Sequence, residues 1–89
     1  MPHKPLAFSP AAADEWDLIV DRDRPLAEAI DPLFDAIEAG ELVGQMFDNH
    51  ARFHTLRIRG RDELYAIVWE VRGDKYILRR IGRVDVPHS

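Results

Sequence analysis

Hydrophobic residues recur at helical spacing in the first half of this chain and alternate with polar residues in the second half. A short apolar run, Leu6 to Phe8, fits a brief strand, and the Ser9-Pro10 pair behind it is typical of a helix start. A serine side chain can cap free backbone amides, and proline at the first helical position gives up no hydrogen bond. Apolar residues then follow every three or four positions to about Val20, which predicts a first helix that ends in the polar stretch 21–24.

A second helix is predicted between Pro25 and Gly40. Its apolar residues fall on one face of a single helix, namely Leu26, Ile30, Leu33, Phe34 and Ile37. Pro32 lies inside this pattern and removes one backbone hydrogen bond, so either the helix kinks there or Asp31-Pro32 begins a new short helix. The unbroken apolar face favours the kink.

The period changes to two after residue 50, which predicts strands over residues 54–59, 65–72 and 76–81 with a tight turn at 72–75. The expected order is β-α-α-β-β-β, an α+β fold with an antiparallel sheet and two helices packed on one face. The helices need an apolar partner surface, for which the sequence offers Tyr65, Ile67, Trp69 and Val71. The opposite sheet face would then carry Val68, Glu70 and part of the arginine set.

The length and composition fit one globular domain over residues 1–89, because 89 residues leave no room for a second core and 46% of them are hydrophobic. The absence of cysteine excludes a disulfide scaffold, a thiol nucleophile and a cysteine zinc site. The longest apolar run, Tyr65 to Trp69, is far shorter than the roughly 20 residues of a membrane helix. No signal peptide is visible, so we expect a cytoplasmic protein without a membrane partner.

Charge is divided unevenly between the two halves of the chain. Residues 1–49 hold 3 basic and 11 acidic side chains, a net charge of −8, whereas residues 50–89 hold 9 basic and 5 acidic ones, a net charge of +4. Two readings stay open: the protein has two faces with different roles, or charge merely follows secondary structure.

The arginines of the second half are the candidates for phosphate chemistry. Arg57 and Arg59 are two residues apart, so on one strand they would point the same way and could grip successive phosphates. Further arginines beside the strands would contribute to RNA binding or charge stabilisation, namely Arg52, Arg61, Arg79, Arg80 and Arg83. The plainer alternative is that these side chains lie in solvent or pair with Glu63, Glu70 or Asp74.

Histidine is the candidate for proton transfer, since it titrates near neutral pH. His54 and His88 are the two candidates for this role. His54 shares its parity with Leu56 and Ile58, so a half-buried structural role is the alternative reading. His88 lies one residue from the chain end. No acid or cysteine completes a metal-ligand set, and no glycine-rich phosphate loop or serine nucleophile elbow is present, so neither a metal nor a cofactor is expected.

The order and lengths of these segments resemble the RelE/ParE superfamily of bacterial toxins. Phe8 to Trp16 resembles the family's first strand entering its first helix, and Phe53 to Arg59 the stretch that carries basic residues in mRNA-cleaving members. Leu64 to Val71 resembles the next strand, and Arg80 to Arg83 the last strand with its basic end. The HigB branch also has a glycine after its second helix, here Gly40. The resemblance covers residues 6–85.

The resemblance implies the toxin of a type II toxin–antitoxin system, neutralised by a cognate antitoxin. RelE-like and HigB-like members cleave mRNA on the ribosome without metal. Carried over by position, Arg57, Arg59 and Arg83 would hold the phosphate, while His54, His88 and Asp85 match positions of acid and histidine groups. An acidic antitoxin segment over the arginines would complement their charge.

Three departures from the family pattern keep other functions open. Ala66 stands where the family usually has an arginine, Val84 stands where a second basic residue would follow Arg83, and the net charge is −4. The alternatives are therefore a ParE-type toxin that poisons DNA gyrase, a catalytically inactive binding protein of this fold, and an unrelated small α+β adaptor.

Overall fold

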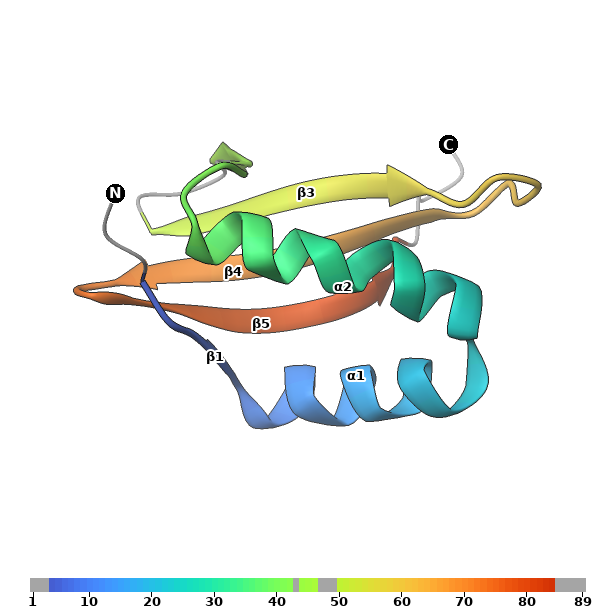
Figure 1. The fold of residues 1–89 in the computed structure, drawn as a ribbon, viewed down its shortest axis with the longest axis horizontal. Helices are drawn as coiled ribbons and strands as arrows, with labels where there is room; N and C mark the ends of the chain where they lie inside the picture. The colour runs from blue at the N-terminus through green and yellow to red at the C-terminus, as the bar shows by residue number, and fades with distance from the viewer. Residues whose placement is uncertain (1–3, 43, 47–49, 85–89) are drawn as a thin grey trace, which may run out of the picture.

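Two helices and five strands make up the fold in the computed structural model, which describes residues 4–42, 44–46 and 50–84. They follow in the order β1 (Leu6–Phe8), α1 (Pro10–Arg22), α2 (Arg24–Glu38), β2 (Gln45–Met46), β3 (Ala51–Arg57), β4 (Leu64–Arg72) and β5 (Lys75–Arg83). Figure 1 shows α2 crossing in front of the sheet, with α1 beside it and the two helices joined at one end.

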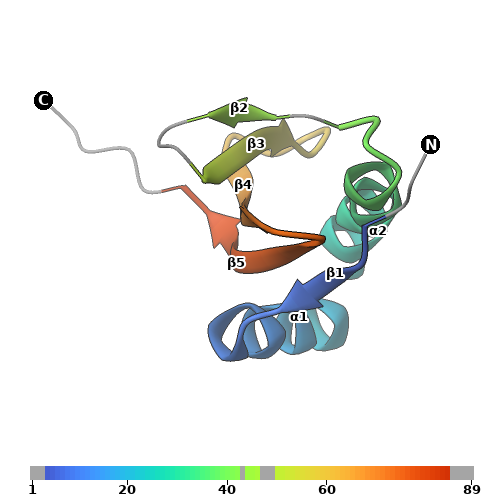
Figure 2. The same ribbon diagram turned by 90° about the vertical axis from the view of Figure 1, so that its left-hand side faces the viewer.

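The strands form one sheet in the spatial order β1-β5-β4-β3-β2. The three long strands β3, β4 and β5 make the predicted antiparallel meander, and Figure 2 shows β1 beside β5 and β2 beside β3. The α+β class and the expected element order are confirmed. The sheet as a whole is mixed, because β1 runs parallel to β5 with Leu6 opposite Tyr76, and β2 is a two-residue addition that the sequence pattern does not predict.

The two helices begin and end where the sequence predicts, within two residues. The Ser9 side chain accepts a hydrogen bond from the backbone N–H of Ala12 at 3.2 Å and so caps α1, with Pro10 behind it. α2 runs unbroken through Pro32, so the single-helix alternative is the right one. Gly40 follows α2 with a φ of +75°, a conformation that favours glycine at the end of a helix.

The core lies between the helices and one face of the sheet, as the sequence predicts. α1 contributes Ala12, and α2 contributes the apolar face that includes Ile30 and Ile37. The sheet supplies Tyr65, Ile67, Trp69, Leu78 and Ile81, whereas Val71, which is also predicted for this surface, is half-buried and outside the core because it lies near the end of β4. Trp69 is only 1% exposed, and burying so large a side chain makes it a major contributor to stability. Neither helix in the described part of the chain has the length and apolar character that crossing a membrane requires.

α1 also covers the stretch of β5 that lies beyond the end of β1. Here the Glu15 carboxylate accepts a hydrogen bond from the backbone N–H of Ile81 at 2.9 Å. A helix side chain thus pairs a backbone donor that would otherwise be left on an open sheet edge.

The first long strand differs in its bounds from the sequence prediction. β3 covers Ala51–Arg57, not residues 54–59, and the chain turns immediately afterwards. The turn is closed by a hydrogen bond from Arg61 N–H to the Ile58 carbonyl at 3.0 Å, and Gly60 adopts a φ of +87° within it. Arg59 therefore lies in the turn, and the expectation that Arg57 and Arg59 point the same way from one strand is wrong.

Gly44 marks the closest approach of backbone to the core. A Cβ atom at this position would lie 2.6 Å from Cη2 of Trp69 and 2.9 Å from the Phe53 carbonyl oxygen. Its φ of +73° adds backbone strain for any other residue. We expect Gly44→Ala to lower the free energy of unfolding by about 2–4 kcal/mol, because strain and steric overlap combine.

Gly60→Ala is the matched control for this prediction, since Gly60 has a similar φ but a Cβ atom there would meet nothing within 4 Å. It should cost only the backbone strain, about 1 kcal/mol. Urea unfolding of both variants measures the difference, and equal losses would contradict the proposed contact with Trp69.

Candidate functional site

The face of the sheet opposite the helices is the candidate site. Side chains alternate along a strand, and cross-strand partners share a face. Since Tyr65, Ile67 and Trp69 point into the core, Ala66, Val68 and Glu70 lie on the open face, as predicted for Val68 and Glu70.

A hollow of about 250 Å³ lies on this open face between β4 and β5. The hollow exists because Ala66 is paired with Gly82, and side chains this small leave the space above them unfilled. Arg80, Arg83 and Glu15 also line it. A hollow with guanidinium groups at its rim has the charge that suits a phosphate group.

Two of the predicted phosphate-binding arginines end the strands on either side of β4. Arg57 is the last residue of β3, opposite Leu64, and so starts on the open face, whereas Arg83 is the last residue of β5, opposite the core residue Tyr65, and lines the hollow from the strand end. Because neighbouring strands lie roughly 4.8 Å apart, these two backbone positions are about 10 Å apart at one end of the sheet. Both residues are exposed, and Arg57 donates to the Asp62 carbonyl at 3.1 Å. Arg59 lies two residues beyond Arg57 in the adjoining turn.

Other arginines of the open face are held by internal carboxylates. Arg80 pairs with Glu15 at 3.2 Å, and Arg79 pairs with Glu70 at 3.1 Å. Arg72 approaches the other oxygen of Glu70 at 2.8 Å. The alternative that arginines pair with Glu70 is therefore correct for Arg79, while the sequence pattern predicts neither the pairing of Arg72 nor the role of Glu15. Within the described part of the chain, Arg57, Arg59 and Arg83 make no such ion pair.

His54 and Arg52 lie on the helix-facing side of the sheet, away from Arg57. Their cross-strand partners are the core residues Ile67 and Trp69, and both side chains are half-buried. Side chains alternate between the two faces along a strand, and Arg57 is an odd number of positions from each of these residues. Its side chain therefore points to the opposite face. The structure thus does not bring His54 together with the arginines of the open face, and the half-buried reading of His54 is the one that fits.

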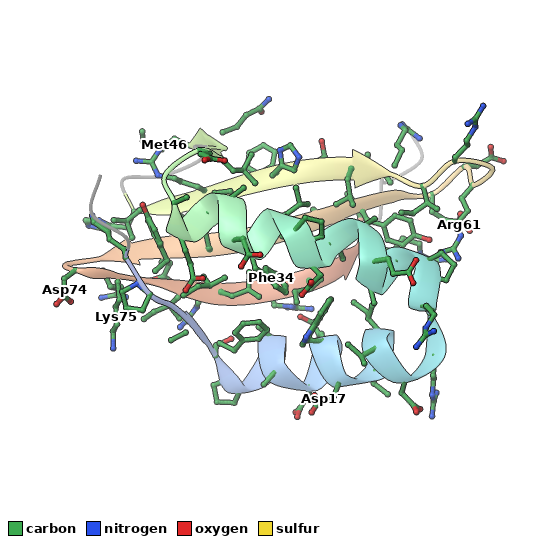
Figure 3. All side chains as sticks on the ribbon, viewed as in Figure 1. Asp17, Phe34, Met46, Arg61, Asp74 and Lys75 are labelled. Carbon is green, nitrogen blue, oxygen red and sulfur yellow. The ribbon has the colours of Figure 1, made fainter. Side chains whose placement is uncertain are left out.

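Arg61 belongs to the loop that joins β3 to β4, and its side chain ties this loop to the corner between the two helices (Figure 3). Its guanidinium donates two hydrogen bonds to the Asp23 carboxylate, at 2.8 and 2.9 Å, and a third to the Tyr65 hydroxyl at 3.0 Å. The hydrogen bond from Arg61 lowers the pKa of Asp23, and the Asp23 carboxylate raises the pKa of Arg61. A bidentate pair of this kind positions the loop, and it occupies the donors that an RNA phosphate would need.

Two further candidates, Asp85 and His88, lie outside the residues that the structure describes. Among the described residues, no group of three or more histidine, cysteine, aspartate or glutamate side chains is placed to hold a metal ion.

Solved structures with the same architecture are toxin–antitoxin proteins, so the chain has the predicted fold of the RelE/ParE toxins. The YoeB dimer from Staphylococcus aureus aligns with a TM-score of 0.59 and 13% identity over 90% of this chain and 95% of that one. The chromosomal ParDE system from P. aeruginosa aligns with a TM-score of 0.58 and 19% identity over 96% and 100%. The YoeB–YefM complex from S. aureus aligns with a TM-score of 0.57 and 12% identity over 89% and 94%.

Comparison with known protein families finds no match, and comparison with curated protein sequences finds none either. At 12–19% identity the likeness to these structures is one of fold.

We expect Asp23→Asn to lower stability at pH 7, because asparagine can still cap α2 but cannot form the ion pair with Arg61. The folded-state pKa of Asp23 lies below its unfolded value of about 3.9, so its contribution is complete above that pH and is lost as the pH falls through the folded pKa. The melting temperatures of wild type and variant should therefore differ at pH 7, and the difference should begin to shrink only when the pH falls below about 4.

Asp21→Asn is the control, since Asp21 is 79% exposed and lies 3.8 Å from Arg22. It should leave the melting temperature nearly unchanged. A difference for Asp23→Asn that does not shrink in acid would show that the ion pair is not its cause.

Proposed function

We propose that this chain is the toxin of a type II toxin–antitoxin pair, and that it acts in the cytoplasm as a metal-independent endoribonuclease on ribosome-bound mRNA. One observation carries the proposal: Arg57 and Arg83, without internal ion pairs among the described residues, stand at one end of the sheet beside a hollow that Arg83 lines. The fold shared with the YoeB and ParDE structures supports the wider class.

The proposed reaction is attack of an RNA 2′-hydroxyl on the adjacent phosphorus. The new O–P bond forms a cyclic 2′,3′-phosphate, and the bond to the 5′ oxygen breaks. Negative charge builds up on the phosphate oxygens, and permanently protonated guanidinium groups stabilise it without moving protons. Arg57, Arg59 and Arg83 take this role, while Arg79 and Arg80 are held by Glu70 and Glu15.

Proton transfer needs a group other than arginine. It must accept the proton of the 2′-hydroxyl and return one to the departing 5′ oxygen. His54 is on the wrong face of the sheet for this, so the proposal assigns the role to His88 of the C-terminal segment. Glu15, which lines the hollow, is committed to Arg80 and to the backbone of Ile81.

A second function, binding without cleavage, is favoured by the neutral floor of the hollow. Ala66 stands where the family usually has an arginine, and the carboxylate of Glu15 offsets Arg80 at the rim. A gyrase-directed toxin would need a protein-binding surface of this kind and no phosphate chemistry. In either case an acidic segment of a cognate antitoxin would suit the exposed arginines.

The first test removes the exposed arginines at the end of the sheet. We expect Arg57→Ala/Arg59→Ala to lower the rate of mRNA cleavage in a translating bacterial extract by about 100-fold or more, which is typical of losing charge stabilisation in a transition state. Growth inhibition on expression should fall in parallel.

Arg72→Ala/Arg79→Ala is the matched control, because it removes two arginines already paired with Glu70. It should retain most of the activity. Equal activity of all three proteins would remove the proposed site. Intact mRNA together with inhibition of purified gyrase in a supercoiling assay would establish the second function instead.

A second test adds the missing charge to the hollow. Ala66→Arg places a guanidinium beside Gly82, where it can reach a phosphate held by Arg83. We expect mRNA cleavage in the same extract to rise by at least tenfold. Thr55→Arg adds the same charge at the neighbouring position of β3, opposite Ala66 and outside the hollow, and should change cleavage little. A rise in both variants would indicate a general charge effect on RNA binding.

A further inference from the structure

A second groove lies on the other side of the molecule, between α1 and α2. Its volume is about 480 Å³, nearly twice that of the hollow on the sheet. Two facing helical stripes line it: Trp16 and Val20 from α1, and Arg24, Ala27, Glu28, Asp31 and Pro32 from α2. The proposed ribonuclease or gyrase-binding function makes no use of this groove.

The groove has an apolar floor with a fixed aromatic ring. The Trp16 ring packs edge-on against Phe34 with the ring centroids 4.9 Å apart, so its orientation is held from the core side. Val20 beside it is 53% exposed and adds apolar surface to the groove. Ala27 and the Pro32 ring extend this apolar surface along α2. An exposed apolar patch beside polar residues is typical of a binding site.

The rim of the groove is acidic over most of the α2 side. Glu28 and Asp31 are exposed and form no ion pair with a described residue, while Arg24 stands at the end where α2 begins. The wider surface has the same sign, because the two helices carry eight carboxylates against two arginines. The groove therefore favours a cationic ligand, with its positive groups toward Glu28 and Asp31.

Pro32 adds a backbone acceptor to this surface. Proline has no N–H to donate to the carbonyl of Glu28, four residues earlier, so that oxygen lacks its usual partner within the helix. Both residues line the groove. A lysine or arginine side chain lying over Trp16 can donate to such a carbonyl and gain a cation–π contact at the same time.

We infer that this groove is a docking site for a basic, amphipathic peptide segment of a partner protein, with apolar side chains on the floor and lysine or arginine side chains along α2. The site is separate from the arginine face on the sheet, which suits acidic partners. One chain can thus hold an acidic and a basic segment at the same time, on opposite sides.

The probe for this inference is a synthetic helical peptide of about 15 residues with leucine on one face, lysine on the other and blocked ends. A second peptide has glutamate in place of every lysine. Titrated into the full chain at about 150 mM salt, the lysine peptide should bind with a micromolar dissociation constant and the glutamate peptide should not. Equal binding of both peptides, or of neither, would overturn the inference.

Paired charge reversals locate the binding. Glu28→Lys/Asp31→Lys changes the rim, whereas Asp14→Lys/Asp17→Lys makes the same change of net charge on α1 outside the groove lining, where Asp17 projects away from α2 (Figure 3). The rim variant should weaken binding at least tenfold and the control less than threefold. All four positions are exposed, and melting curves check that both variants fold. Equal weakening would mean non-specific attraction to the acidic helices.

The two tryptophans provide a readout that needs no substitution. Trp16 lines the groove, whereas Trp69 is buried in the core. In ¹⁵N-labelled protein the indole resonance of Trp16 should shift on addition of the lysine peptide, while that of Trp69 stays in place. Binding that leaves the Trp16 resonance unchanged would place the peptide elsewhere and overturn the inference.

Discussion

The alternation of side chains along β3 and β4, continued along β5 apart from an irregularity at Arg79, governs the arrangement of charge in this protein. One face of these strands packs against the helices, and Tyr65, Ile67 and Trp69 lie on it. Every second position is thereby committed to the core, and the remaining positions are left to solvent. The arginines available for ligands are those that fall on the open face or at the strand ends, and a shift of one residue would have put different ones there.

Carboxylates then divide the arginines of the open face into two groups. Glu70 holds Arg72 and Arg79, and Glu15 holds Arg80 while also pairing a backbone amide of β5. Exposed pairs of this kind add little stability each, but they fix the side chains and reduce the positive potential in the middle of the face. The potential that remains is concentrated at one end, around Arg57, Arg59 and Arg83.

The sequence is sufficient to predict the element order because each element has its own signal. Ser9-Pro10 marks the start of α1, an apolar face spans Pro32, and strict alternation marks β4. The end of β3 escapes prediction because alternation continues through Ile58 and Arg59 although Gly60 already turns the chain. The alternation of side chains along a strand is enough to predict that His54 and Arg57 point to opposite faces of the sheet. By contrast, the pairs Asp23–Arg61 and Glu15–Arg80 join residues 38 and 65 positions apart, and nothing local predicts such contacts.

Asp23 is the single residue between the last position of α1 and the first of α2, and its side chain caps the second helix while its backbone N–H bonds to Ile19 in the first. No spare residue exists at this corner to absorb an insertion or deletion. Adding one amino acid would rotate one helix against the other by about 100° and turn its apolar stripe away from the core. Insertions and deletions in homologues should therefore be rare at this corner and more frequent in loops whose residues neither cap a helix nor bond to one.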